Sequence, residues 1–322
     1  MIKILDCSNS GERQEHRGGR GPVTNDVMRY LQTYASDYGC VFTGDVAKAD
    51  IIITNDVFPT KLHSVKLPKL KRMDGVYFQN QFKVRNEPLN QSALLADHVI
   101  FISEFSRQSY DILYGQPLKS FSIALNQVDP SVYYANSSIS KNERFTLISS
   151  ATSWDREEKR LADIIRFAKI SGEQIQLIGS MSDSVKASIP DNVLSLGYNT
   201  DNEKTCRQLN EASAFLNFSY KDAAPKTVLQ GLCCGLPVFY ANSGGLQELV
   251  GECGVGISDG DYKNRFEERC PMLDLDDVME MWAVFKSSCR KLQELTSVRD
   301  NEDKFRVMLE QYFGQIKRLV YV

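Results

Sequence analysis

Residues 219–251, SYKDAAPKTVLQGLCCGLPVFYANSGGLQELVG, change from a helical to an extended pattern and back again. Pro225 suits the first helical position, where a missing N–H costs nothing, and Gly235 suits the left-handed residue that ends a helix. Residues 236–240 form a short apolar run, which is typical of a buried strand. The Ser-Gly-Gly turn at 243–245 then leads into a second helix. The stretch therefore predicts helix, buried strand, glycine loop and helix, as in an α/β fold.

Two helices, beginning at Lys226 and Leu246, would open beside the end of the same strand. Free backbone N–H groups and the positive end of the helix dipole make each helix start a site for anionic oxygen. Asp222 lies just before the first helix, and Gln230 lies about one and a half turns into it. This layout predicts a phosphate-linked ligand that carries hydroxyl groups at either end.

The stretch resembles the donor-sugar region of the family 4 glycosyltransferases, which are retaining enzymes of the GT-B fold. Their pattern is Glu-x7-Glu, then Gly-x-Pro-Val, a Gly-Gly loop and a further Glu. The matching positions are Gly235, Leu236, Pro237, Val238, Gly244, Gly245 and Glu248. The acidic pair departs from the pattern, because it reads Asp222-x7-Gln230. The resemblance implies that Asp222 lies near the donor sugar and that Gln230 binds the ribose, with an amide in place of a carboxylate.

Length and composition allow two ordinary domains, since 322 residues with 42% hydrophobic residues can bury a sizeable core. A net charge of −3 gives no reason to expect nucleic acid as a partner. The basic cluster Lys66–Arg72 could contact acidic substrates or lipid headgroups, so peripheral membrane contact stays open. For this cluster alone we favour a solvated loop.

The eight cysteines form no C-x2-C pair, and none of the three histidines has a zinc-like neighbour. The N-terminal segment MIKILDCSNS lacks the long apolar core of a signal peptide. No apolar run approaches the length that spans a bilayer. We therefore expect a cytoplasmic protein with reduced thiols and no metal.

Short apolar runs alternate with helical patterns along the chain, which predicts parallel sheets covered on both faces. The expected strands are residues 2–5, 40–43, 50–54, 99–102, 120–124, 145–149, 174–179, 193–196, 214–218 and 237–241. The expected helices are residues 25–38, 92–96, 104–114, 159–171, 200–210, 226–234, 275–294 and 301–319.

Two similar α/β halves predict a cleft, because ligands of open α/β sheets bind outside the carboxyl ends of strands. The GT-B resemblance also implies two Rossmann-like domains across a cleft, with the last helix returning to the first domain. We expect an acceptor-side domain at 1–135, a donor domain at 136–303 and a returning helix at 304–322. The polar stretch 136–143 is the expected linker.

Two further segments follow the family pattern in the right order. Residues 126–129, Asn-Gln-Val-Asp, resemble the Asn-Gly-Val-Asp turn at the domain junction. In the family, the loop after the next strand carries an Arg and a Lys that bind the donor diphosphate, and Lys159 aligns with that Lys. Trp154 stands at the Arg position, so Arg156 or Arg160 would supply the second cation. Without the downstream motif, an exposed, charged helix start would be the better interpretation.

Two segments of the first half are candidates for the acceptor side. Gly18, Gly19 and Gly21 follow the first strand, and glycines let a backbone approach a ligand closely. Their spacing nearly imitates a dinucleotide fingerprint but lies too far from the strand end. A flexible glycine loop stays an open alternative. Arg72 and Asp74, in an Arg-x-Asp-Gly segment, are either a surface strand of alternating charge or the acceptor-side wall of the cleft.

Several polar motifs have a structural explanation that needs no function. Asp274-Leu275-Asp276 matches a metal-binding Asp-x-Asp but precedes a helix, where acids stabilise the N-terminus. Ser103 can cap the helix that follows it. His16, near the glycine loop, is a weak acid–base candidate.

The resemblance implies a retaining glycosyltransferase that needs no cofactor beyond a nucleotide-diphosphate sugar as co-substrate. Its acceptor would be a glycan, a lipid or a small molecule. Asp222 and Lys159 would be catalytic. The donor would be bound by Arg156, Arg160, Thr227, Val228, Gln230, Gly244, Gly245 and Glu248. The alternatives are a sugar-nucleotide epimerase, a non-catalytic sugar-nucleotide-binding module and, on the glycine spacing, a disfavoured dehydrogenase.

Overall fold

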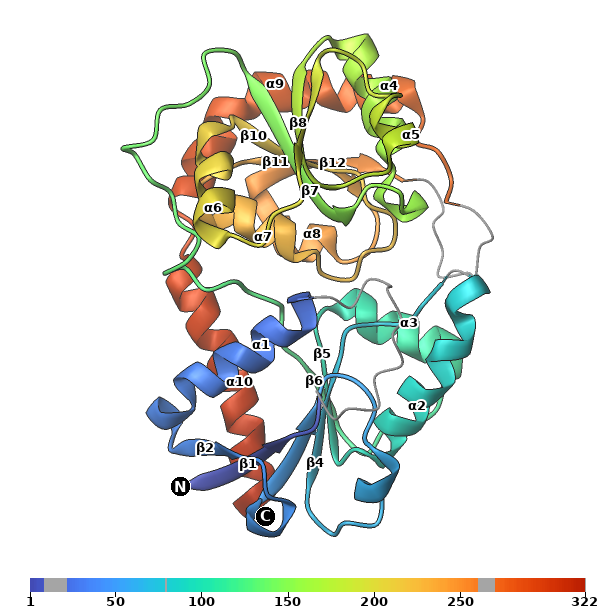
Figure 1. Ribbon diagram of the computed structural model, residues 1–322, viewed down its shortest axis with the longest axis vertical. Coiled ribbons are helices and arrows are strands. Elements are labelled where there is room, and N and C mark those ends of the chain that lie inside the picture. Colours follow the sequence, from blue (N-terminus) through green and yellow to red (C-terminus); the bar gives the residue numbers. More distant parts are fainter. Residues whose placement is uncertain (9–21, 79, 260–269, 322) are drawn as a thin grey trace. The chain divides into compact units, whose positions relative to one another are not determined.

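The computed structural model describes residues 1–8, 22–78, 80–259 and 270–321. The chain divides into two compact units (Figure 1). The first comprises residues 1–126 together with 306–322, and the second comprises residues 127–305. The division lies before the boundary that we expected at residues 135/136.

The first unit is built on a six-stranded parallel sheet in the order β2-β1-β3-β4-β5-β6. Its strands are β1 (Ile2–Asp6), β2 (Cys40–Thr43), β3 (Ile51–Thr54), β4 (Lys69–Met73), β5 (His98–Phe101) and β6 (Phe121–Ile123). Ile4, Ile51 and Ile53 are fully buried, as strands covered on both faces require.

The helices of the first unit lie between its strands, and the last helix of the chain joins them. They are α1 (Pro22–Tyr34), α2 (Asn86–Leu95), α3 (Glu104–Tyr114) and most of α10 (Asn301–Tyr321). Short 3-10 turns occupy Ala35–Tyr38, Val46–Lys48, Thr60–Leu62 and Asn80–Arg85. In α10, Phe313 stacks on Tyr38 with ring centroids 4.4 Å apart, so residues from 306 onward pack within this unit.

The second unit contains another six-stranded parallel sheet, in the order β12-β11-β10-β7-β8-β9. Its strands are β7 (Thr146–Ser153), β8 (Gln174–Ser180), β9 (Val193–Gly197), β10 (Ala214–Asn217), β11 (Val238–Asn242) and β12 (Gly254–Ser258). The chain adds β8 and β9 on one side of β7 and then returns to add β10 on the other. This order is that of a Rossmann sheet, and its topological switch point lies between β7 and β10.

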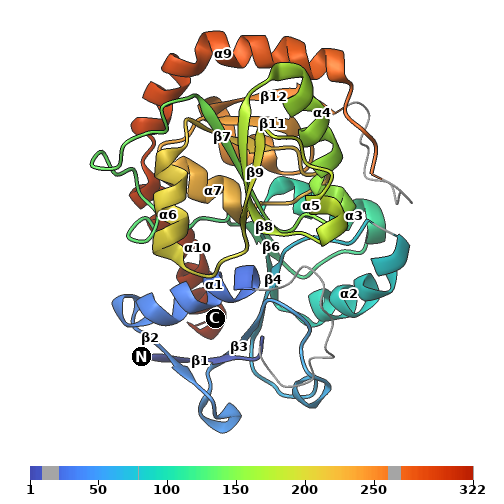
Figure 2. The same cartoon turned by 45° about the horizontal axis from the view of Figure 1, so that its top comes forward.

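Helices cover both faces of the second sheet (Figures 1 and 2). They are α4 (Leu161–Ser171), α5 (Asp183–Lys186), α6 (Asn202–Glu211), α7 (Lys226–Cys233), α8 (Leu246–Val250) and α9 (Leu275–Ser297), with 3-10 turns at Glu157–Lys159 and Gly251–Cys253. The helices α4 and α9 contact each other, and they meet the sheet in an aromatic cluster of Phe167, Phe218, Phe239, Trp282 and Phe285. The helices α6, α7 and α8 are likewise neighbours.

The expected strands and long helices are confirmed, within a few residues at their ends. Two strands were missed. One is β12, whose sequence Gly-Val-Gly-Ile-Ser is too rich in glycine to read as an apolar run. Gly254 is needed there, because a Cβ at this position would lie 2.2 Å from the Val238 carbonyl oxygen.

The other missed strand is β4, and the solvated loop expected at Lys66–Arg72 is wrong. All of β4 is buried between β3 and β5, and Arg72 is only 1% exposed. The charged ends find partners inside the unit: Lys69 Nζ donates to the Val65 carbonyl at 2.6 Å, and Lys71 Nζ donates to the Asp56 carbonyl. The surface strand of alternating charge is excluded for the same reason.

The stretch that we expected to be a linker, residues 136–143, is bound to the second unit. The Asn136 amide donates to Asn210 Oδ1 at 2.8 Å, and Lys141 Nζ donates to the Ala212 carbonyl at 2.7 Å. All eight cysteines are free thiols. Within the described ranges, no helix is both long enough and apolar enough to cross a bilayer.

Candidate functional site

The carboxyl ends of β7 and β10 carry the two residues that the sequence marks as catalytic. These strands pair with each other, so the loops that follow them begin side by side. Lys159, after β7, places its Nζ 2.8 Å from Oδ2 of Asp222, after β10. The two side chains are 15% and 25% exposed. The structure therefore brings Lys159 and Asp222 together at the switch point of the Rossmann sheet, where such sheets bind their ligands.

The glycine loop after β11 fixes the backbone of Asp222. Gly244 forms a parallel bridge with Asp222, and the Gly245 amide donates to the Asp222 carbonyl at 3.0 Å. Gly244 has a φ of +79°, and a Cβ there would lie 2.3 Å from the Asp222 carbonyl oxygen. Only glycine fits this approach, so the loop sets the direction from which Asp222 presents its carboxylate. The Gly245 N–H is therefore already hydrogen-bonded to protein, and it is not the group that we expected to donate a hydrogen bond to the phosphate.

Helix α7 begins four residues after Asp222, at Lys226, with Pro225 as its N-cap residue. Val228 is fully buried, and its amide donates to the Pro225 carbonyl at 3.1 Å, so Val228 supports the helix from within. Lys226 and Thr227 are the first helical residues, whose amides have no acceptor within the helix. Of the expected helix-start donors, the structure therefore leaves Thr227.

Two other residues expected to bind the donor are Gln230 in α7 and Glu248 in α8. Gln230 is 7% exposed in α7, and Gly231 packs so closely on Phe215 of β10 that a Cβ would lie 2.7 Å from the ring. Glu248 is exposed in the first turn of α8. Gln230 is thus held firmly against the sheet, whereas Glu248 faces solvent.

The cations expected beside Lys159 have other partners. Trp154 points into the core, where its Nε1 donates to the Ile178 carbonyl at 3.1 Å. Arg156 is paired with Glu158, its Nε lying 2.6 Å from Oε1. Arg160 is 3% exposed and forms a bidentate pair with Asp259, at 2.8 and 2.9 Å. The guanidinium of Arg160 is therefore committed to protein, which contradicts its expected role as a diphosphate ligand.

Two lysines that the sequence analysis passed over flank Asp222. Lys221 has a left-handed φ of +51°, is 8% exposed and places its Nζ 4.9 Å from the centroid of the Tyr220 ring. Lys226 opens α7, and burial lowers its pKa from 10.5 to about 8. The sequence signal was present, because Lys-Asp-Ala-Ala-Pro-Lys puts a cation on each side of the site carboxylate.

No protein family model matches the chain, and no curated protein matches its sequence. Solved structures do match. HepE of Anabaena, solved with UDP and glucose, has a TM-score of 0.68 at 15% identity, over 99% of this chain and 100% of that one. Sucrose-phosphate synthase of Thermosynechococcus elongatus has a TM-score of 0.67 at 13% identity, over 99% and 89%. A glycosyltransferase of Rickettsia africae has a TM-score of 0.62 at 14% identity, over 96% and 84%.

The chain has the GT-B fold. The expected fold class, with a parallel α/β sheet in each half, is confirmed. At such low identities the likeness concerns the fold, so the roles of individual residues rest on the geometry above. The domain bounds and the cleft of the GT-B expectation stay predictions.

The expected acceptor-side residues belong to the first half of this fold. Gly18, Gly19 and Gly21 lie outside the described residues, as does His16. Arg72, the residue before the last of β4, pairs with Asp74, and its Nη2 donates to Asn126 Oδ1 at 2.8 Å. The Asp74 side chain is 24% exposed, against 1% for Arg72, so Asp74 is the member of the pair that solvent can reach.

The motifs that we attributed to helix capping are confirmed as caps. Asp274 accepts from the Asp276 amide at 2.8 Å at the start of α9. Ser103 and Ser106 form a reciprocal capping box at the start of α3. Within the described part of the chain, no three His, Cys, Asp or Glu side chains converge as a metal site would require.

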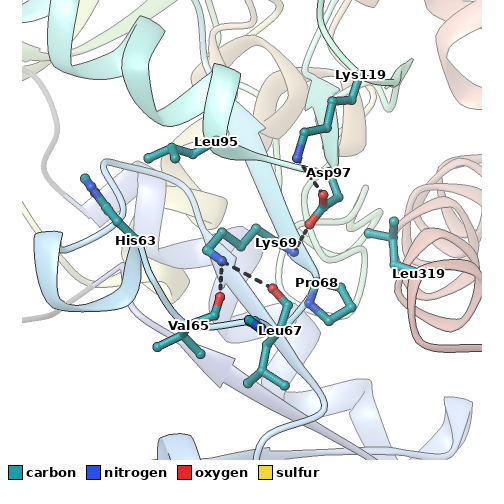
Figure 3. Close-up of a pocket in the computed structure, with 10 residues that line it drawn as sticks. His63, Val65, Leu67, Pro68, Lys69, Leu95, Asp97, Lys119 and Leu319 are labelled. Atoms are coloured by element: carbon teal, nitrogen blue, oxygen red, sulfur yellow. Dashed lines mark hydrogen bonds and ion pairs between the residues drawn. The ribbon is translucent and has the colours of Figure 1, made fainter.

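A cavity of about 480 Å³ opens at the amino ends of β4 and β5, the edge of the first sheet opposite to Asp74 (Figure 3). Two of the three lysines that line it point at protein oxygens. Lys69 Nζ donates to the Val65 and Leu67 carbonyls, and Lys119 Nζ pairs with Asp97 Oδ1 at 2.8 Å (Figure 3). These cations are satisfied within the protein, so we assign no ligand to the cavity.

Proposed function

We propose that this chain is a glycosyltransferase that takes a sugar from a nucleotide-diphosphate sugar. One observation carries the proposal: the Lys159–Asp222 contact of 2.8 Å lies at the switch point of the second sheet, shortly before the start of α7. The matched solved structures support it, because one of them holds UDP and glucose and others are named glycosyltransferases or a sugar-phosphate synthase.

In this proposal the second unit binds the donor. The diphosphate lies against the Thr227 amide in the first turn of α7, where the helix dipole favours negative charge. Lys159 exchanges part of its contact with Asp222 for a diphosphate oxygen and stabilises the charge that develops as the sugar–phosphate bond breaks. Asp222, released from that contact, accepts hydrogen bonds from sugar hydroxyls. Gln230 binds the ribose through its amide.

Transfer would retain the configuration of the sugar, as the resemblance to family 4 implies. The acceptor oxygen attacks the anomeric carbon on the face from which the phosphate leaves, and the phosphate oxygen takes the acceptor's proton. This route needs no protein nucleophile. We place the acceptor, a glycan, a lipid or a small molecule, with the first unit, where Asp74 is the reachable carboxylate. Arg72 would hold Asp74 in place.

A sugar-nucleotide-binding protein without transfer activity is the second candidate. The observation that favours it is the Asp222–Gln230 pair, which carries one carboxylate where the family pattern has two. Such a protein would bind the donor and release no nucleoside diphosphate when acceptors are added.

The first test is a thermal-shift screen of the wild type with UDP-, GDP-, ADP- and TDP-sugars. At about a hundred times Kd, a bound donor stabilises the folded state by about 2.7 kcal/mol. Lys159→Ala should weaken the best donor by roughly tenfold or more, because it removes a charge-assisted hydrogen bond. Lys286→Ala is the matched control, since Lys286 Nζ lies 3.1 Å from Glu173 Oε1, next to the amino end of β8.

The result that would sink the proposal is the absence of stabilisation by every nucleotide-sugar. An unchanged response of Lys159→Ala would remove Lys159 from the site while leaving donor binding in place. Release of nucleoside diphosphate from the best donor, measured with and without pools of glycan, lipid and small-molecule acceptors, separates a transferase from a binding module.

A further inference from the structure

Arg160 directly follows Lys159 in the sequence, yet its side chain belongs to a different network. Its Nη1 and Nη2 donate to the two carboxylate oxygens of Asp259, at 2.9 and 2.8 Å, and Nε donates to the Pro271 carbonyl at 3.0 Å. The Arg160 and Asp259 side chains are 2% and 3% exposed. Asp259 comes immediately after β12, so this pair joins the loop after β7 to the far edge of the sheet.

The same guanidinium also contacts the loop that presents Asp222. Its Cζ lies 4.6 Å from the centroid of the Tyr220 ring. Tyr220 is two residues before Asp222, and its amide donates to the Glu158 carbonyl at 2.8 Å. The loops after β7 and β10 are therefore joined twice beside the Lys159–Asp222 contact, once by backbone and once by the Arg160–Tyr220 stack.

The backbone of Arg160 separates its side chain from that of Lys159. Arg160 adopts a left-handed conformation, with φ 51° and ψ 42°, which is uncommon for a residue with a long side chain. Its carbonyl accepts from the amides of Asp163 and Ile164, which begins α4. The turn at Arg160 thus ends the 3-10 segment that carries Lys159 and sends the next side chain into the interior.

We propose that Arg160 is a positioning residue of the donor site: anchored by Asp259, it holds Tyr220, and through Tyr220 it sets the place of Asp222 opposite Lys159. A planar guanidinium suits this task, because one fork can bind a carboxylate while its face stacks on a ring. This role rests on the proposed function, since it concerns the same site. It differs from a phosphate-binding role in that Arg160 never touches the donor.

The two roles predict opposite effects of one substitution. If Arg160 were a diphosphate ligand, Asp259→Asn would release it from its anchor, and donor affinity would stay or improve. If Arg160 is a positioning residue, Asp259→Asn releases Arg160 from its anchor and lowers the affinity for the donor. Arg160→Lys keeps the charge but loses the fork. We expect both variants to weaken the best-binding nucleoside diphosphate of UDP, GDP, ADP and TDP by about tenfold, the equivalent of one charge-assisted hydrogen bond.

A third variant tests the contact through which Arg160 acts. Tyr220→Leu removes the ring and leaves the Arg160–Asp259 pair in place, so it also decides the question if either of the other variants fails to fold. It should weaken the nucleoside diphosphate by about the same factor. Phe145→Leu is its matched control, because Phe145 lies under Lys286 at 4.0 Å, directly before the amino end of β7. The control should bind within about twofold of the wild type.

Isothermal titration of the folded variants at one temperature gives the dissociation constants, and circular dichroism confirms folding. Weaker binding by Asp259→Asn and by Tyr220→Leu supports the positioning role. Wild-type affinity in Asp259→Asn or in Tyr220→Leu overturns it while leaving the proposed function standing. A wild type that binds none of the four nucleoside diphosphates refutes the proposed function, and the positioning role with it.

Discussion

Each of the two parallel sheets ends in a cation–carboxylate pair at its carboxyl edge, and the two pairs differ in the burial of the cation. In the first unit, Arg72 is 1% exposed and pairs with Asp74. In the second unit, Lys159 is 15% exposed and pairs with Asp222. The carboxylates are alike, at 24% and 25% exposed. What separates the pairs is therefore the freedom of the cation to leave its partner.

A buried guanidinium with several protein acceptors cannot be given to a ligand without loss. Arg72 binds Asn126 Oδ1 as well as Asp74, and it acts on Tyr312 of α10, whose pKa is raised to about 12 by burial, with Arg72 opposing the rise. Lys159 is bound at one oxygen and reaches solvent. The first pair is built to hold the unit together, whereas the second can exchange one oxygen for another.

The largest expected contrast is in stability. Arg72→Met should lower the free energy of unfolding by about 3 kcal/mol or more, because it leaves Asp74 and Asn126 without their buried partner. Lys159→Met should change it by less than about 1 kcal/mol, as for a partly exposed pair. Urea unfolding measures both. Far-UV circular dichroism follows the whole chain, and fluorescence follows the second unit, which contains both tryptophans, Trp154 and Trp282.

Equal losses in the two variants would break the comparison, because they would mean that burial of the cation does not distinguish the pairs. A loss of stability in Lys159→Met alone would mean that the partly exposed pair stabilises the fold more than the buried pair does.

The second contrast concerns pH, because the first sheet also buries a histidine. Both ring nitrogens of His98 lie 2.9 Å from serine oxygens, those of Ser120 and Ser122. Burial lowers the pKa of His98 to about 4, with a smaller contribution from Arg318. The unfolded chain binds this proton with a pKa of about 6.5, so the folded state binds fewer protons between pH 4 and 6.5. Stability should therefore fall with the pH across that window.

The expected loss amounts to roughly 3 kcal/mol between pH 7 and pH 4, at most about 1.4 kcal/mol per pH unit. Carboxylates titrate in the same range, so the measurement compares urea unfolding of the wild type with that of His98→Gln, which keeps a hydrogen-bonding side chain. The difference in the free energy of unfolding between the two proteins should show the expected dependence on pH. Parallel profiles would contradict the prediction, because they would mean that His98 binds its proton equally well in the folded and the unfolded chain.

The sequence predicted residues 219–251 of the second unit better than β4 of the first, for a physical reason. The strands β10 and β11 are largely apolar, and proline and glycine mark the limits of α7, so residues 219–251 could be assigned element by element. In contrast, β4 reads Lys-Leu-Lys-Arg-Met. Its cations are buried because their ends reach protein oxygens, and two of these, the Asp56 carbonyl and Asn126 Oδ1, lie 15 and 54 residues away in the sequence. Periodicity cannot reveal such partners.

The candidate site was predictable to the same extent. Lys159 and Asp222 were found because motif order and parallel strand ends converge on one edge. The buried pairing of Arg160 could not be predicted, because its partner Asp259 is distant in the sequence. The left-handed turn that separates Arg160 from Lys159 also contains no glycine that would have indicated the turn. Two neighbouring cations can therefore differ in their environment: Lys159 is partly exposed, whereas Arg160 is buried and paired with Asp259.

The smallest expected effect concerns the second cation at the reachable site. Lys226 opens α7, and burial lowers its pKa to about 8. A lysine is charged below its pKa, so a diphosphate at this helix start would bind most tightly below pH 8. Above pH 8, its binding would be coupled to the uptake of a proton by Lys226. Between pH 7 and pH 9 the affinity for a nucleoside diphosphate should fall by roughly tenfold, as the charged fraction falls. Lys226→Met should bind more weakly at pH 7 and show a flat profile. An equal fall in both proteins would assign the effect to another group and leave Lys159 as the cation that the exchangeable pair supplies.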